Sequence, residues 1–403
     1  MSRHHVIVAG SVLVDMLGYG LIMPLLPFIV KTWVNDATVI GLLGSLYAAM
    51  QLLAAPLLGT LSDRIGRRPV LLICLFGSAV AYLGLALAGS LPLVILAIAL
   101  GGAAGSSMPV AQAYIADTTT AERRAQGFGL LGAAFGLGLI GGSAIGGLLS
   151  QYGAALPPAV AATIAFLNAL WATIALPETL PPNRRRIQPV RLTTPFVAAT
   201  TVLLLPQIRP LLGAVVILNI AFAGLQNNVA YFTMTRFDWG PEQNAVLFVF
   251  VGLCAVITQG VLLRMLQPLL GERHLASGGL GLMALGFALV GLVHNESWRL
   301  FPIAAMFATG MGLAVPALTS LISLRAGDRR QGAILGGMQT LISIALVTGP
   351  LSFGFMFDQI GPDAPYLIGS LMLLGAWLIT VLTFVRPKPV TTGLLHPVED
   401  SEA

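Results

Sequence analysis

Long apolar segments alternate with short polar or glycine-rich segments along the whole chain. An α-helix needs about 20 apolar residues to cross the hydrocarbon core of a bilayer, and the apolar segments here are of about that length. The pattern therefore predicts an all-α membrane protein with twelve transmembrane helices. Their expected boundaries are 6–30, 40–61, 69–89, 91–116, 125–150, 157–177, 210–234, 243–266, 274–293, 298–324, 331–356 and 363–385.

A polar break interrupts this alternation in the middle of the chain. Residues 178–209 are rich in arginine and proline, a composition typical of a linker between folded parts. The break divides the twelve helices into two pseudo-symmetric bundles. We therefore expect a six-helix bundle at 1–177, a cytoplasmic linker at 178–209, a second six-helix bundle at 210–386 and a cytoplasmic tail at 387–403.

Composition supports the membrane interpretation independently. Only 9% of the residues are charged, 56% are hydrophobic, and the mean hydropathy is +0.88. Soluble domains carry about 25% charged residues, so a soluble chain of 403 residues with this composition would expose large apolar patches. The lipid bilayer is the expected partner of this surface.

The short motifs of enzymes are absent from the sequence. No Gly-Lys-Ser loop that could cradle a phosphate occurs, which argues against ATP-driven pumping. Cys74 and Cys254 both lie in apolar segments and suggest neither a disulfide framework nor a metal site. We expect a protein that is not an enzyme and that binds neither a cofactor nor a metal.

The basic residues are distributed asymmetrically over the expected loops. Of the 21 lysines and arginines, only Lys31, Arg236 and Arg299 fall on one side of the membrane, and an excess of these residues marks cytoplasmic loops. Both termini share a side because the number of spans is even, so we expect both in the cytoplasm of a bacterium, at its plasma (inner) membrane. Nucleic-acid binding is the weaker explanation of the net charge of +5, because the basic residues are dispersed over short loops.

The two halves of the sequence are alike in the placement of their charged loops. Asp117 to Arg124 follows the fourth span, and Arg325 to Arg330 follows the tenth. The next spans begin near Gln126-Gly127 and Gln331-Gly332. Internal repeats of this kind place the substrate site of secondary transporters near the bilayer midplane, between the halves.

A dense cluster of charge lies between the second and third spans. Residues 59–69 read Gly-Thr-Leu-Ser-Asp-Arg-Ile-Gly-Arg-Arg-Pro, which resembles the cytoplasmic signature loop of the major facilitator superfamily of transporters. Residues 15–27 are similar to the first helix of its drug-efflux branch, which includes tetracycline/proton antiporters, and residues 113–117 and 177–179 resemble the ends of the fourth and sixth helices. The resemblance implies two six-helix bundles that rock about a central cavity for a small-molecule substrate. We expect a monomer.

The charged loop can act as a latch. Asp63 stands at a helix C-terminus, where the helix dipole disfavours an anion, so we expect it to pair with a cation or with the start of the fifth span. Arg67 can bridge to Asp117 or Glu122, which would hold the cytoplasmic side shut in one state. A solvated positive loop without this role is the alternative. The expected gate residues are Gly59, Asp63, Arg64, Gly66, Arg67, Arg68, Asp117, Glu122 and Arg123.

Asp15 is an acidic residue within an apolar span. It lies about nine residues into the first span, or roughly 13 Å deep at 1.5 Å per residue. A carboxylate there is costly and is by default a functional hypothesis, and desolvation favours the neutral form of a carboxylic acid. Gly18 and Gly20 are expected to leave space beside it for water or substrate. We expect Asp15 to couple transport to protonation; the alternative is a structural carboxylate bonded to a neighbouring helix.

The fifth span is rich in glycine, with Gly138, Gly142 and Gly146 at four-residue spacing. One helix face is nearly bare as a result, which permits close helix contact and bending. The antiporters that the chain resembles carry a Gly-Pro pair in this segment, whereas Gly142 is followed here by Ser143. Helix packing alone is an equally good interpretation of these glycines.

Three further positions depart from the antiporters that the chain resembles. Ile98 stands near an arginine that many of them carry in the fourth helix. Ala81 and Ala284 stand where tetracycline exporters place acidic residues, in the third and ninth helices. These differences argue against export of tetracycline–metal complexes and leave proton coupling open.

Polar and aromatic residues within the apolar spans are candidates for the wall of a central cavity. Buried amides need hydrogen-bonding partners, and methionine adds adaptable apolar surface. For each polar residue, a hydrogen bond to a neighbouring helix is an equally good explanation. With a single buried acid expected, the cavity suits neutral, amphipathic or cationic molecules better than anions. The candidates are Tyr19, Tyr47, Gln51, Met108, Gln112, Asn219, Gln226, Asn227, Tyr231, Gln339 and Thr340.

These observations favour a secondary transporter that exports small amphipathic or drug-like molecules by alternating access, as in multidrug efflux, in exchange for protons. An uncoupled facilitator or a metabolite importer of the same fold is the first alternative, favoured by Ile98 and Ser143. A membrane receptor or scaffold that keeps the fold without moving substrate is an alternative of another class.

Overall fold

Helices account for almost the whole of the described chain. In this computed structural model, the structure describes residues 3–119, 124–185, 194–326 and 331–385. Within these ranges it contains α-helices and short 3-10 or π-helical turns, and no β-strand. The predicted all-α class is confirmed.

The helices of the first half (residues 3–185) are joined by short turns. Pro92 and Pro157 stand in the first turns of two of these helices, where a proline costs no hydrogen bond and its fixed φ suits a helix start. The bounds are α1 Arg3–Ile22, α2 Leu26–Val30, α3 Ala37–Ile65, α4 Arg67–Ala86, α5 Leu91–Ala104, α6 Ser107–Thr118, α7 Arg124–Ser150 and α8 Leu156–Ala175. Two spans are each built from two consecutive helices: α1 and α2 form the span His5–Val30, and α5 and α6 form the span Leu91–Thr118.

The helices of the second half (residues 194–385) follow the same plan, with one sharp bend. The unit Pro241–Leu292 is 52 residues long, more than twice the length that one crossing requires. Its backbone turns at Gly271, where φ is 70°, a conformation that glycine adopts without steric cost. The bounds are α9 Thr194–Leu203, α10 Arg209–Phe237, α11 Pro241–Ile257, α12 Leu263–Leu292, α13 Leu300–Ala326, α14 Gln331–Gln359 and α15 Ala364–Val385.

The number of membrane crossings agrees with the sequence. Among the described residues, eleven helical units are long and apolar enough to span a membrane. The unit that bends at Gly271 supplies two crossings, so the chain crosses twelve times. The prediction of twelve spans is confirmed, and the observed helix ends lie within a few residues of the predicted ones.

The middle of the chain holds a helix that was not predicted. We expected a linker throughout residues 178–209, but Thr194–Leu203 forms α9. Ala199 and Val202 on this helix are buried, and Val202 packs beside Gly337 of α14. The arginines and prolines that suggested a linker lie mostly before residue 194. The apolar segment that follows them is long enough to form a short helix.

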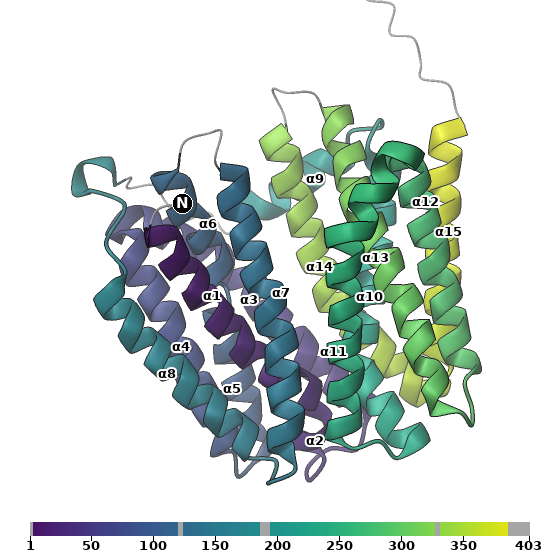
Figure 1. Cartoon of the computed structure of the whole chain (residues 1–403), viewed down its shortest axis with the longest axis horizontal. Coiled ribbons are helices and arrows are strands. Elements are labelled where there is room, and N and C mark those ends of the chain that lie inside the picture. Colours follow the sequence, from purple (N-terminus) through teal and green to yellow (C-terminus); the bar gives the residue numbers. More distant parts are fainter. Residues whose placement is uncertain (1–2, 120–123, 186–193, 327–330, 386–403) are drawn as a thin grey trace, which may run out of the picture.

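The helices run between two ends of the molecule (Figure 1). We call the end where the N-terminus lies the amino face, and the opposite end the distal face. The turn at Gly66 and residues 176–185 belong to the amino face. The turns at 31–36, 238–240 and 360–363 belong to the distal face, since each follows or precedes a complete crossing.

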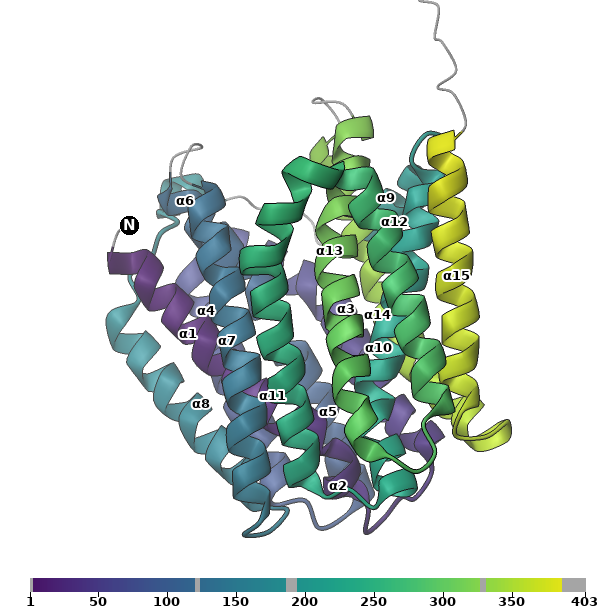
Figure 2. The same ribbon diagram turned by 45° about the vertical axis from the view of Figure 1, so that its right-hand side comes forward.

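The two halves meet closest to the distal face and diverge toward the amino face (Figures 1 and 2). α3 packs against α14, and α7 packs against α11. On the distal side of the α3–α14 pair the backbones touch: a Cβ on Gly41 would lie 2.3 Å from the carbonyl oxygen of Pro350, and one on Gly354 would lie 2.3 Å from that of Ala37. The structure is therefore closed at the distal face.

The buried apolar side chains divide in the same way. The larger cluster continues from residues of the first half, such as Leu26, into the second half, such as Phe353. The smaller cluster contains only first-half residues from near the amino face, such as Val8, Leu71 and Tyr114. Apolar packing thus joins the halves distally and holds the first half together by itself at the amino face.

Candidate functional site

A network of charged side chains surrounds the turn between α3 and α4 at the amino face. Arg67 Nη1 lies 2.6 Å from Asp63 Oδ1, and Arg67 Nε lies 2.9 Å from Asp117 Oδ2 at the end of α6. Nη1 also donates to Ser62 Oγ at 2.6 Å. The predicted bridge from Arg67 to Asp117 is confirmed. The guanidinium joins α3, α4 and α6, all of which belong to the first half.

Glu178 completes this network, although it was not among the predicted gate residues. Its Oε1 accepts hydrogen bonds from the backbone N–H groups of Arg67 at 3.0 Å, Thr179 at 2.9 Å and Leu180 at 3.0 Å. A Cβ on Gly66 would lie only 2.2 Å from Glu178 Oε2, and the φ of Gly66 is 112°. Glycine is required here both for the turn and for the approach of the carboxylate. The glutamate after Pro177 was the available sequence signal.

The other predicted gate residues play different roles. Arg68 donates to the carbonyl oxygen of Thr173 at 2.6 Å, which ties α4 to α8. Gly59 faces open space, and Arg64 lies in the last turn of α3. Glu122 and Arg123 lie outside the described residues, as do the side chains at the start of α7. The expected contact between Asp63 and the fifth span therefore stays a prediction.

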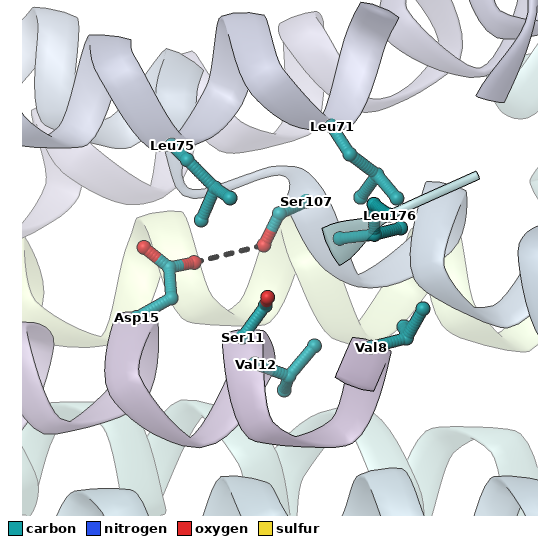
Figure 3. Close-up of a pocket in the computed structure, with 8 residues that line it drawn as sticks. All are labelled: Val8, Ser11, Val12, Asp15, Leu71, Leu75, Ser107 and Leu176. Carbon is teal, nitrogen blue, oxygen red and sulfur yellow. Dashed lines mark hydrogen bonds between the residues drawn. The ribbon is translucent and has the colours of Figure 1, made fainter. Parts of the chain in front are cut away.

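Asp15 is buried within the first half, with 2% of its surface exposed. Ser107 Oγ of α6 donates to Asp15 Oδ2 at 2.9 Å, and the buried Ser78 of α4 lies near the carboxylate. Figure 3 shows Asp15 at one end of a small pocket between α1, α4 and α6. The bond from Ser107 lowers the cost of burying the carboxylate.

The space beside Asp15 is not where the sequence suggested. A Cβ on Gly18 would lie 2.7 Å from the Tyr82 ring, and one on Gly20 would lie 2.5 Å from the carbonyl oxygen of Leu139. The expectation that these glycines leave room for water or substrate was wrong, because a tyrosine ring and the α7 backbone fill it. The pocket lies instead on the side of α1 that carries Ser11.

The glycines of α7 allow close contact with α1. A Cβ on Gly138 would lie 2.4 Å from the carbonyl oxygen of Leu13, one on Gly142 would lie 2.2 Å from that of Leu17, and one on Gly146 would lie 2.7 Å from that of Leu21. The three contacts advance by one turn along both helices. This geometry supports the packing interpretation and fixes α1, which carries Asp15, against α7.

The predicted cavity residues of the first half are mostly engaged with neighbouring helices. The rings of Tyr19 and Tyr47 lie 5.3 Å apart. Gln51 Nε2 donates to the carbonyl oxygen of Gly105 at 3.1 Å. Met108 is partly exposed and Gln112 is exposed on α6. The tyrosine pair and Gln51 connect α1, α3 and the middle of the fourth span, where α5 meets α6.

The predicted cavity residues of the second half fall into three groups. Asn219 and Thr340 are buried and bond to carbonyl groups one turn earlier on their own helices. Gln226 is partly exposed, and Gln339 is exposed. Asn227 and Tyr231 instead reach the first half: the Asn227 amide packs against Gly44, and the Tyr231 hydroxyl donates to the carbonyl oxygen of Asn35.

A carboxylate that the sequence analysis missed joins the halves at the distal face. Asp358 of α14 accepts hydrogen bonds from the backbone N–H groups of Ala37 at 3.1 Å and Thr38 at 2.7 Å, and from Thr38 Oγ1 at 2.5 Å. These N–H groups begin α3, where a helix favours an anion. About two turns deeper along the same two helices, Ser45 Oγ accepts from the backbone N–H of Leu351 at 3.1 Å. We call Asp358, Ala37, Thr38, Ser45 and Leu351 the distal clamp.

The positions that depart from the antiporter pattern are all buried. Ile98, Ala81 and Ala284 lie in the apolar core. Ser143 is also buried, and its hydroxyl donates to the carbonyl oxygen of Leu139 on its own helix at 2.9 Å. Ile98, Ala81 and Ala284 therefore carry no charge where the antiporters that the chain resembles have an arginine or an acidic residue.

A twelve-span helical protein with two halves about a central axis defines a class of membrane transporter. The sequence profile of the Major Facilitator Superfamily matches residues 8–350 and, in a second alignment, residues 264–396. The chain belongs to the Major Facilitator Superfamily. It is therefore a multi-pass membrane transporter, as the charged loop at 59–69 suggested.

Proteins named for antibiotic resistance are among its relatives. The chain is 35% identical to the class D tetracycline resistance protein of Salmonella ordonez over 97% of its own length and 99% of the relative's. It is 33% identical to the class E protein of Escherichia coli over 100% of the chain and 99% of the relative. These similarities confirm the resemblance to the drug-efflux branch.

Solved structures show the same fold. The human organic anion transporter MFSD10 matches with a TM-score of 0.71 and 26% identity, over 94% of this chain and 99% of that one. The nucleoside transporter NupG matches with a TM-score of 0.76 and 12% identity, over 96% of this chain and 100% of that one. The second likeness, at this low identity, concerns the fold alone.

Proposed function

We propose that this transporter exports small amphipathic or drug-like molecules in exchange for protons. The observation that carries the proposal is Asp15, a carboxylate buried in the first span and hydrogen-bonded by the hydroxyl of Ser107. A buried carboxylate can exist as a neutral acid or as an anion, and the two forms bind their surroundings with different free energy. Protonation at this position can therefore be coupled to the position of α1.

The substrate class follows from the relatives and from the chemistry of the spans. Two relatives that align over their full length are named for tetracycline resistance, which supports export of a drug-like molecule. Ala81 and Ala284 are apolar and buried, so a metal–tetracycline complex would meet no carboxylate at these positions. We infer neutral, amphipathic or cationic substrates. The organic anion transporter MFSD10 makes organic anions the class to test against them.

The proposed orientation puts the amino face in the cytoplasm of a bacterium, with the protein in its inner membrane. Lys31, Arg236 and Arg299 lie at distal turns, and Arg236 is held there by Asp363 at 2.6 Å. The basic residues near Gly66, together with Arg185, belong to the other end, which supports a cytoplasmic amino face. The proposed units are bundles at 1–177 and 210–386, a linker at 178–209 that includes α9, and a tail at 387–403, in a monomer.

Alternating access requires one contact set at each face. The distal clamp supports a state closed to the outside and open to the cytoplasm. In the opposite state the proposed latch around Asp63 and Arg67 would hold the amino face shut. The network at Arg67 would then exchange part of its bonding within the first half for contacts with the second half.

An uncoupled facilitator or importer remains the second candidate, because Ile98, Ala81 and Ala284 supply no further charge within the spans. A non-transporting receptor or scaffold is the third. Purified protein in liposomes with an internal pH-sensitive dye separates them. Proton movement that depends on added substrate supports the antiporter. Substrate uptake without proton movement supports the facilitator. If neither substrate uptake nor proton movement is observed, the result supports the receptor or scaffold and contradicts the proposed export.

A further inference from the structure

The pocket beside Asp15 is a site that the transport function alone does not explain. It lies inside the first half, between α1, α4 and α6, and Leu176 closes it just after α8. It has room for about one water molecule, which needs two to four polar partners to be stable there. Its polar side chains are Asp15, Ser11 and Ser107 (Figure 3).

Ser11 provides an independent sign of an occupant. Its side chain is buried, with 5% of its surface exposed, and its Oγ has no hydrogen-bonding partner among the described residues. A buried hydroxyl without a partner is costly. Ser11 precedes Asp15 by four residues and therefore lies on the same face of α1, and Figure 3 shows its hydroxyl directed into the pocket.

The partners available in the pocket match the requirements of one water. Ser107 Oγ uses its proton on Asp15 Oδ2 at 2.9 Å and keeps lone pairs that can accept a bond. Ser11 Oγ can both donate and accept, and the carboxylate can accept. The amide of Asn168 fixes this turn of α1 by donating to the carbonyl oxygen of Ser11 at 3.0 Å.

The pocket extends from Asp15 toward the amino face. Its other end is formed by Val8, Leu71 and Leu176. Leu71 lies one turn after Arg67, and Leu176 precedes Glu178 by two residues, so these side chains lie next to the charged network around Gly66. Val8, Leu71 and Leu176 form the apolar end of the pocket on the side of that network.

We propose that Asp15 exchanges its proton with the amino face through a water molecule held by Ser11 and Ser107, inside the first half. This inference rests on the proposed proton coupling and adds the route. In release, the O–H bond of the Asp15 acid breaks and the proton passes to the held water. That water passes one of its own protons to a second water entering past Val8 and Leu176. The carboxylate remains, the held water is restored, and no electrons are transferred.

The titratable groups that face Asp15 do not compete as charges. Cys74 and Tyr82 belong to α4 and Tyr47 belongs to α3. Thiols and phenols of ordinary acidity are neutral at neutral pH. Ser11 and Ser107 are therefore positioning residues, which act through the water and not through a charge of their own.

The experiment is a pH jump on the full chain in lipid nanodiscs, followed by infrared spectroscopy of the protonated carboxyl group of Asp15. The band is assigned by its loss in Asp15→Asn. We expect Ser11→Ala to slow deprotonation about ten-fold, which corresponds to about 1.4 kcal/mol in the barrier. Ser11→Thr keeps the hydroxyl, and Ser11→Val has the same shape without it. Asp15 should therefore deprotonate faster in Ser11→Thr than in Ser11→Val. Thermal unfolding of Ser11→Ala should stay close to the wild type, because Ser11 Oγ has no hydrogen-bonding partner among the described residues and only its bond to the held water is lost.

The outcomes separate the route from the function. Ser370→Ala is the control, since this buried serine bonds only to the carbonyl oxygen of Ala284 in the second half, at 2.8 Å; its rate should equal the wild type. If Ser11→Ala and Ser11→Val both deprotonate at the wild-type rate, the proposed route is wrong while proton coupling stands. If the wild-type band does not change between mildly acidic and mildly alkaline pH, proton coupling itself fails.

Discussion

Small residues determine how the helices around Asp15 pack. Gly138, Gly142 and Gly146 bring the α7 backbone against α1, and Gly18 admits the Tyr82 ring. A glycine at such a contact cannot be replaced without moving a backbone. The position of Asp15 in the bundle is therefore determined by glycines, which have no side chain that could bind substrate or a proton.

Replacing Gly142 with alanine should destabilise the protein. The new Cβ would lie 2.2 Å from the carbonyl oxygen of Leu17, and overpacking of this kind costs about 1–3 kcal/mol. Gly141→Ala is the matched control, because a Cβ on Gly141 meets nothing within 4 Å. Thermal unfolding in detergent measures both. Equal midpoints for the two variants would contradict the packing role.

The sequence identified Asp15 but not its immediate surroundings. An acid in an apolar span is a rare and costly feature, so it can be recognised in isolation. Ser11 could not be, because serine is common in membrane helices and only the three-dimensional arrangement leaves its hydroxyl unpaired. Glu178 was missed for a related reason: its contact with the N–H of Arg67 joins residues that are distant in sequence.

At the scale of elements, α3 connects the two faces of the molecule. Its first N–H groups are bound by Asp358 of the second half, and its last turn carries Asp63, paired with Arg67 of the first half. A tilt of α3 relative to α14 would break the distal contact. We therefore expect charge changes at its two ends to shift the conformational equilibrium in opposite directions.

Asp358→Asn should open the distal face. The substitution keeps the shape of the side chain but removes the charge that favours the start of α3, a loss of about 1 kcal/mol, or roughly a five-fold shift between the two states. The control is Asp36→Asn, because Asp36 precedes the same helix without a side-chain bond to it. Spin-label distances across the distal face measure the shift. An unchanged distance distribution in Asp358→Asn would rule out the clamp.

Asp63→Asn should slow transport while leaving the fold intact. Asp63 is 45% exposed, so its ion pair with Arg67 contributes less than about 1 kcal/mol to stability. The proposed latch should nevertheless form more weakly, which lowers the population closed at the amino face. Turnover in liposomes and thermal unfolding are measured together. Wild-type turnover would mean that this charged loop serves only to orient the protein.

The sequence predicted the helices better than the connections. The apolar segments and the charged residues between them marked the spans, and Gly271 fell between two of the predicted spans. α9 was missed because the arginines before residue 194 dominated the composition of the break, and burial of Val202 against Gly337 depends on tertiary contact. Propensity alone cannot supply that contact.

At the scale of the whole molecule, the halves meet at the distal face and diverge toward the amino face. Orientation in the membrane therefore decides which side of the cell the open end faces. Asn183→Cys lies at the amino face and Tyr152→Cys at the distal face, and both native residues are exposed. We expect an impermeant thiol reagent added to intact cells to label Tyr152→Cys alone. Labelling of Asn183→Cys under these conditions would reverse the orientation.

In the proposed mechanism, transport is coupled to protonation of Asp15. Asp15→Asn mimics the neutral acid in shape, so substrate binding and exchange should persist without a pH gradient. The decisive measurement compares, in the same liposomes, exchange of labelled for unlabelled substrate with accumulation driven by a pH gradient. We predict that Asp15→Asn retains exchange and loses pH-driven accumulation. Accumulation at the wild-type level would make Asp15 a structural residue and favour the uncoupled facilitator.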